Sequence, residues 1–177
     1  MIYVSSRVSA FDPKFVVDAM LGDLARWLWM LGVDAKYVPD LCDEDIVEMA
    51  VRESRVVVTR DRGLWCRCIE LKLPVIYQEG GELDELLAFI CETFHIELEV
   101  DPRRARCSRC GAPLVFVPRE ELVDRVATGS LRRFTEFWVC RYCGAVYWCG
   151  SHHRNIREFL KRIRLRAKTI KCHVVYV

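Results

Sequence analysis

The sequence has no apolar run that approaches the roughly 20 residues needed to span a bilayer. Its N-terminus lacks the basic start, continuous apolar stretch and small-residue cleavage site of a signal peptide. No Gly-x-Gly-x-x-Gly or Walker loop follows any predicted strand, which argues against dinucleotide-binding and P-loop enzymes. We therefore expect a cytoplasmic protein with no membrane partner and no small-molecule organic cofactor.

The charges are distributed unevenly along the chain. Residues 1–100 carry 10 Lys and Arg against 19 Asp and Glu, whereas residues 101–177 carry 17 against 6. Composition changes near Asp101, so we predict one domain over residues 1–100 and another over residues 101–177. This asymmetry favours an acidic part that collects cations joined to a basic part that meets polyanions. Two ordinary domains with different surface charge remain the alternative.

Strand and helix patterns alternate between residues 15 and 94. Short runs rich in β-branched residues predict strands at 15–17, 34–38, 55–59 and 74–77. Apolar residues at helical spacing predict helices at about 21–31, 43–51, 62–71 and 83–94. This alternation predicts an α/β fold with a parallel sheet that helices cover on both faces. Residues 1–14 form either a lead-in or an edge strand.

Acidic residues stand where three of these strand-to-helix connections lie. Asp18 follows the first strand, Asp61 follows the third, and Asp43 precedes the second helix. The carboxyl ends of parallel strands share one edge of a sheet, so the three carboxylates should gather there and bind a divalent metal. Each acid is also a good helix cap. Because helix boundaries shift by a residue or two, Glu44 or Asp45 is an alternative to Asp43.

Four cysteines form two copies of one Cys-x-x-Cys-Gly motif, which is typical of a zinc ribbon. They are Cys107, Cys110, Cys140 and Cys143. The 29 residues between the pairs exceed the usual gap, so we expect an insert with a short helix at 120–126. Four protein ligands complete a structural Zn²⁺ site and leave no place for Cys149, His152 or His153. The remaining cysteines, which are Cys42, Cys66, Cys68, Cys91 and Cys172, are expected in the core.

A basic amphipathic helix is predicted after Gly150. Its apolar positions are Ile156, Phe159, Leu160 and Ile163, and its basic positions include Arg154, Arg157, Lys161 and Arg164. Beside a zinc ribbon, such a helix favours a nucleic-acid contact over a membrane surface. A solvated helix face is the alternative.

Three segments, at 15–31, 42–46 and 58–61, resemble PIN-like nucleases. The chain is most similar to the group in which a PIN-like domain precedes a zinc ribbon, as in the C-terminal RNase domain of Mut-seven-type exonucleases. This resemblance implies that Asp18, Asp43 and Asp61 are catalytic and bind Mg²⁺ or Mn²⁺. Many PIN-like proteins have a further acid at the position that Gly63 occupies here.

Two functions are consistent with these patterns. The first is a metal-dependent ribonuclease, a hydrolase whose acidic domain cleaves RNA phosphodiester bonds while the ribbon and the basic helix hold the RNA. Divalent ions held by carboxylates neutralise the transition state and activate water in such reactions. The second is a non-catalytic RNA- or ribosome-binding adaptor in which the acids only cap helices. Acids at all three connections favour the enzyme.

Overall fold

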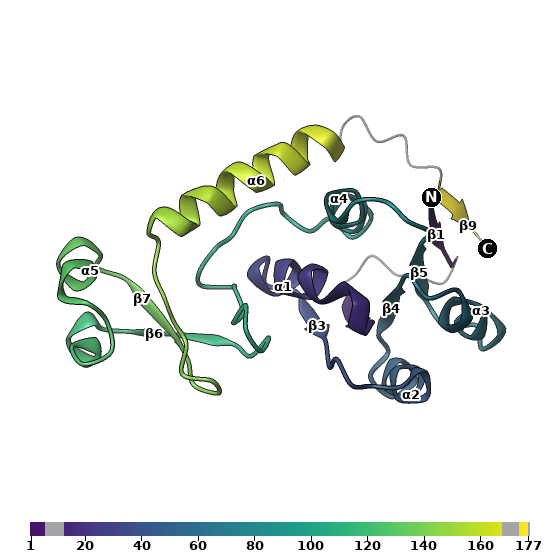
Figure 1. Cartoon of the computed structure of the whole chain (residues 1–177), viewed down its shortest axis with the longest axis horizontal. Coiled ribbons are helices and arrows are strands. Elements are labelled where there is room, and N and C mark those ends of the chain that lie inside the picture. The colour runs from purple at the N-terminus through teal and green to yellow at the C-terminus, as the bar shows by residue number, and fades with distance from the viewer. Residues whose placement is uncertain (6–12, 168–173, 177) are drawn as a thin grey trace.

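A computed structural model describes residues 1–5, 13–167 and 174–176 (Figure 1). A six-stranded sheet has the order β3-β2-β4-β5-β1-β9. Its strands are β1 (Ile2–Val4), β2 (Lys14–Val17), β3 (Asp34–Lys36), β4 (Val56–Thr59), β5 (Val75–Gln78) and β9 (Val174–Tyr176). The four central strands of the prediction are present and mutually parallel. The sheet is nevertheless mixed, because β1 is antiparallel to β5, and β1 is not an edge strand, because β9 pairs with its other side.

Helices cover both faces of this sheet. Alternate residues of each strand point to opposite faces, and apolar residues stand on both, so each face needs a helix layer to bury it. They are η1 (Ala19–Leu21), α1 (Gly22–Met30), α2 (Asp43–Glu53), α3 (Arg62–Glu70) and α4 (Leu83–Thr93). Val58 of β4 belongs to the core that α1 and α4 cover, and Val57 to the core that α2 and α3 cover. Both valines are fully buried. The fold is therefore the predicted α/β arrangement.

A second, three-stranded antiparallel sheet follows, with the order β6-β7-β8. Its strands are β6 (Leu114–Val117), β7 (Phe137–Cys140) and β8 (Val146–Tyr147). The insert between β6 and β7 contains a 3-10 helix, η2 (Arg119–Leu122), and α5 (Thr128–Arg133), instead of the single helix expected at 120–126. Leu122 and Phe137 are fully buried in a small core of this unit.

Helix α6 (Ser151–Ala167) runs from the second sheet across α1 and α4 (Figure 1). Leu160 and Ile163 are buried in the core that α4 also lines. The Phe159 ring stacks on Trp27 of α1, with centroids 4.4 Å apart. The domain boundary near residue 100 remains a prediction. Helix α6 and strand β9, which come after that boundary, both pack on elements that precede it.

The cysteines outside the two motifs divide into two groups. Cys68 and Cys91 are buried, as expected. Cys42 and Cys66 are exposed, so their assignment to the core was wrong. Cys42 is the N-cap residue of α2, and Cys66 lies on the exposed face of α3. Cys172 lies outside the described residues. Within the described part of the chain, no helix has the length and apolar character needed to cross a membrane.

Candidate functional site

Asp18 and Asp61 are joined by the side chain of Thr59. Asp18 directly follows β2, and its amide donates to the Val58 carbonyl of the neighbouring strand β4 at 3.0 Å. The Thr59 hydroxyl donates to Oδ2 of Asp18 at 2.6 Å and accepts from the amide of Asp61 at 2.8 Å. Thr59 is completely buried, so its rotamer is held by packing. One buried hydroxyl therefore orients the two acids at this edge of the sheet.

Helix capping explains only part of the acidic pattern. Asp61 is the N-cap of α3, and its Oδ1 accepts from the Leu64 amide at 2.9 Å. Asp18 stands at the N-cap position of η1, but its side chain makes no capping bond. Asp43 is the first residue of α2, and no side chain caps that helix. The capping interpretation thus holds for Asp61 alone and occupies one of its two carboxylate oxygens.

Asp43 differs from the two acids that follow it. Partial burial, and then the negative charges of Asp61, Asp18 and Glu44, raise the pKa of Asp43. Glu44 forms an ion pair with Arg67, which lowers the pKa of Glu44 to about 2. Oδ2 of Asp45 accepts from the Cys42 thiol at 3.1 Å. Among the described residues Asp43 has no such partner, so its carboxylate is the one at this helix start that is available to a ligand.

The three aspartates approach one another without forming a closed ligand set. Asp43 lies close enough to Asp18 and Asp61 for their charges to raise its pKa. Within the described residues, however, these three carboxylates are not among the groups whose ligand atoms all lie within 4.8 Å of one another. Their assignment as catalytic metal ligands stays a prediction.

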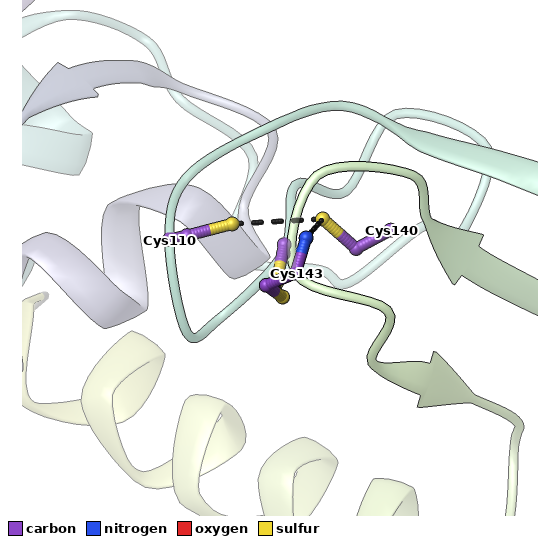
Figure 2. Close-up of side chains that lie close together, drawn as sticks. Cys110, Cys140 and Cys143 are labelled. Atoms are coloured by element: carbon purple, nitrogen blue, oxygen red, sulfur yellow. Dashed lines mark hydrogen bonds between the residues drawn. The ribbon is translucent and has the colours of Figure 1, made fainter.

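The four motif cysteines do form such a group. Their Sγ atoms all lie within 4.8 Å of one another. The Cys107 and Cys143 sulfurs are 3.4 Å apart, and those of Cys110 and Cys140, which face each other in Figure 2, are 3.5 Å apart. A tetrahedral zinc ion with Zn–S bonds of about 2.3 Å separates its sulfurs by about 3.8 Å. The cluster therefore fits Zn²⁺, and the predicted zinc ribbon is present.

Neighbouring groups favour the thiolate form that zinc binds at Cys107, whereas burial raises the pKa of Cys110. The Tyr147 hydroxyl lies 3.1 Å from Sγ of Cys107. Burial acts to raise the pKa of Cys107, but hydrogen bonds from Tyr147 and from the Arg109 amide lower it to about 7. Cys149 and His153 are outside the four-cysteine group, as expected, and the side chain of His152 lies outside the described part.

The first cysteine loop docks on α1. Gly111 has a φ of +71°, and a Cβ there would lie 2.6 Å from the indole of Trp29. The Arg106 amide donates to the Trp29 carbonyl at 2.8 Å. Trp29 is buried, and its indole nitrogen donates to the Ala35 carbonyl at 2.7 Å. This loop is therefore packed against the first sheet unit through a fixed tryptophan.

The four basic side chains predicted to bind nucleic acid are exposed on α6 but differ in their partners. Within the described residues, the Arg154 and Arg157 guanidinium groups form no ion pair and no hydrogen bond. Lys161 pairs with Glu158 at 2.8 Å, and Nη2 of Arg164 donates to the Leu98 carbonyl at 3.1 Å. Their role in binding nucleic acid stays a prediction.

Two residues of these sites were not identified from the sequence. Thr59 was included only as the last residue of the predicted strand 55–59, and Tyr147 was assigned no role. A hydroxyl at the end of the otherwise apolar run 56–58, two residues before an acid, was a usable signal for Thr59. Tyr147 carried no comparable signal, because its contact with Cys107 joins residues 40 positions apart.

Comparison with known proteins gives one match. The model of the Mut7-C RNAse domain family matches residues 13–160, which include strands β2 to β8, all four motif cysteines and the first part of α6. Searches of curated proteins and of solved structures each found no match.

Proposed function

Because this chain belongs to the Mut7-C RNAse domain family, which indicates a nuclease-like role, we propose that it is a metal-dependent ribonuclease. Asp18, Asp43 and Asp61 hold Mg²⁺ or Mn²⁺ in this proposal and are its catalytic residues. The zinc ribbon and α6 hold the RNA.

The observation that carries the proposal is the arrangement of Asp18, Thr59 and Asp61. The buried Thr59 hydroxyl donates to one carboxylate oxygen of Asp18 and so fixes the orientation of that carboxylate. The other oxygen of Asp18 stays available to a metal. Hydrogen bonds to a carboxylate that binds a metal orient that carboxylate in many proteins. Capping does not account for Asp18, whose side chain makes no bond to a helix start.

The donor set fits a hard divalent cation, which prefers carboxylate oxygens. When bound, such an ion neutralises charge on the reacting phosphate and lowers the pKa of a bound water. The protein's own contribution is to supply the carboxylates, to orient Asp18 through Thr59, and to keep Asp43 unpaired while Glu44 is held by Arg67. Partial burial raises the pKa of Asp43 most, and the negative charges of Asp61, Asp18 and Glu44 raise it further; a bound cation would compensate these charges.

RNA affinity has to come from outside the acidic edge. Residues 1–100 carry a net charge of −9, which repels a polyanion, whereas residues 101–177 carry +11. The exposed guanidinium groups of Arg154 and Arg157 on α6 form no ion pair or hydrogen bond with any described residue. We assign them, with Lys161 and Arg164, to contacts with RNA phosphates.

The test is cleavage of a defined single-stranded RNA with Mg²⁺, with Mn²⁺ and without either ion. Wild type should cleave only when a divalent ion is added, and Asp18→Asn should remove cleavage while RNA affinity is retained. Asp124→Asn is the matched control, because Asp124 is exposed and lies in the ribbon insert. Equal cleavage by Asp18→Asn and wild type would overturn the proposed site.

The second candidate is a non-catalytic RNA- or ribosome-binding adaptor. The capping bond of Asp61 favours it, because that acid has a structural role already. If the protein is an adaptor, the wild type will bind the RNA but leave it intact at every divalent ion concentration.

A further inference from the structure

A cavity of about 800 Å³ lies where the two sheet units meet α6. Its walls come from α1, from residues 100–109, from the β7 and β8 region and from the first turn of α6. This volume falls within the range of about 300–1,000 Å³ that is usual for ligand sites. None of the four cysteines or the three aspartates lines the cavity, although Tyr147 of its lining also contacts Sγ of Cys107.

The lining combines flat aromatic rings with cations. Trp27, Tyr147 and Trp148 supply rings, and Arg26, Arg109 and His153 supply basic groups. Among the described residues of the lining, Asp23 is the only acid, and it pairs with Arg26 at 3.2 Å between two exposed side chains. Such an exposed pair contributes little and is easily exchanged for another anion.

Two of the basic groups lack a protein partner. The Arg109 guanidinium is exposed and forms no ion pair or hydrogen bond with any described residue. Nε2 of His153 is buried and also has no hydrogen-bond partner among the described residues. Buried polar atoms without partners are uncommon, so the His153 nitrogen marks a position where a ligand group is expected.

The cavity also lies on the helix that starts at the acidic edge. Asp18 directly precedes η1, and α1 begins at Gly22. Arg26 is four residues, or about one helical turn, past that start. A single-stranded RNA with one phosphate at the three aspartates could therefore extend along α1 to the cations and aromatic rings of the cavity.

We propose that this cavity binds an unpaired nucleotide of a single-stranded RNA. Single strands are recognised by stacking of bases on aromatic side chains together with cations that follow the backbone. In this assignment the rings contact the base, and Arg26 and Arg109 contact flanking phosphates. The inference rests on the proposed function only in taking RNA as the substrate class.

The test measures binding of a short oligouridylate without added Mg²⁺ or Mn²⁺, so that binding is separated from cleavage. The variant is Arg26→Glu with Arg109→Glu. Its matched control is Arg52→Glu with Arg119→Glu, which makes the same charge change at exposed residues outside the cavity. Zinc content is measured in each variant, because Arg109 lies between two of the cysteines.

Loss of the Arg109 contact, and of a contact at Arg26 that competes with Asp23, should flatten the slope of log affinity against log salt by between about 0.7 and 1.4, since each full contact to a single strand contributes about 0.7. The control should keep the wild-type slope. A 4-thiouridine in the oligouridylate should crosslink to Trp27, Tyr147 or Trp148 in wild type. Uridine monophosphate alone should compete only at concentrations far above those of the oligonucleotide, because it lacks the flanking phosphates.

Equal slopes for wild type and the cavity variant, or crosslinks only elsewhere, would overturn this assignment even if wild type cleaves RNA. Competition by the free nucleotide as strong as that of the strand would overturn it in favour of a mononucleotide site. Cleavage abolished by Asp18→Asn would meanwhile uphold the proposed function independently of this result.

Discussion

The hydroxyl of Thr59 donates a 2.6 Å hydrogen bond to the carboxylate of Asp18 from a fully buried position. The two residues are 41 positions apart and come from the ends of neighbouring parallel strands. The same oxygen accepts from the amide of Asp61, so the Thr59 side chain links Asp18 to Asp61. Thr59 is therefore the residue whose removal should disturb the site without changing its charge.

Thr59→Val should raise the Mn²⁺ concentration needed for half-maximal cleavage about 10- to 100-fold, the usual effect of losing a hydrogen bond that orients a metal ligand. Val keeps the size of Thr but leaves the Asp61 amide without its acceptor. Thr59→Ser keeps the hydroxyl and should stay near wild type. A Mn²⁺ titration of RNA cleavage measures both. Equal Mn²⁺ requirements for the Val and Ser variants would contradict the role of the hydroxyl.

Asp43→Asn should stabilise the metal-free protein at neutral pH. Burial and neighbouring charges raise the pKa of Asp43 in the folded chain, so ionising it costs stability as pH rises from the ordinary value of 3.8 through the raised one. The gain should be below about 1 kcal/mol because solvent screens this exposed group. It should disappear at pH values below the ordinary pKa.

Urea unfolding at neutral and at acid pH measures this difference between wild type and Asp43→Asn. Added Mn²⁺ should reverse the order at neutral pH, because an ion that binds only the folded wild type stabilises it. Asp124→Asn is again the control, since Asp124 is exposed and lies in the ribbon insert. A variant that is less stable than wild type at neutral pH without metal would contradict the expected sign.

The central strands were predictable because burial on both faces requires a continuous apolar run. Val56, Val57 and Val58 are all buried, and they alternate between the two cores on opposite faces of the sheet. The pairing of β1 with β9 was not predictable, because it joins the two ends of the chain through a register that no local pattern encodes. The exposed Cys42 and Cys66 show a related limit, since composition alone does not say which helix face meets the sheet.

Among the candidate sites, too, local motifs were predictable from the sequence and contacts between distant segments were not. The cysteine cluster was predictable because each pair and its glycine lie within five consecutive residues. The distinction between Asp43 and Glu44 as metal ligands required the structure, since Glu44 is held by Arg67 from another helix. The contact between Gly111 and Trp29 likewise joins segments that are distant in the sequence and leaves no trace in either one.

Metal analysis of freshly prepared, reduced protein should find one zinc per chain. The four sulfurs lie within 4.8 Å of one another, and binding at such a site contributes on the order of 10 kcal/mol to folding in zinc peptides. Cys110→Ser should therefore lose zinc and unfold the β6-β7-β8 sheet, as followed by hydrogen exchange. Cys149→Ser is the control, since Cys149 is exposed and outside the cluster. Full zinc occupancy in Cys110→Ser would count against the assigned ligand set.

Gly111→Ala should destabilise the protein more than Gly144→Ala. The two glycines follow equivalent cysteines, with φ values of +71° and +76°, so each substitution carries a similar backbone strain of about 1–2 kcal/mol. A Cβ at 111 would lie 2.6 Å from Trp29, whereas one at 144 would meet nothing closer than 3.7 Å. Overpacking should add about 1–3 kcal/mol at Gly111. Urea unfolding compares the two, and equal losses would contradict the contact with Trp29.

Arg154→Glu together with Arg157→Glu should weaken RNA binding through the salt-dependent part of affinity. Both guanidinium groups are exposed on α6 and have no partner among the described residues, so each is available to a phosphate. The slope of log affinity against log salt should fall by about 1.4 for a single strand of any sequence. Lys161→Glu should change the slope by less than one full contact, because Lys161 is already paired with Glu158 at 2.8 Å. Fluorescence anisotropy with two unrelated RNA sequences at several salt concentrations measures all three slopes. If the double variant keeps the wild-type slope with zinc still bound, the RNA does not follow this face of α6, and the exposed arginines of the insert, Arg132 and Arg133, become the next positions to reverse.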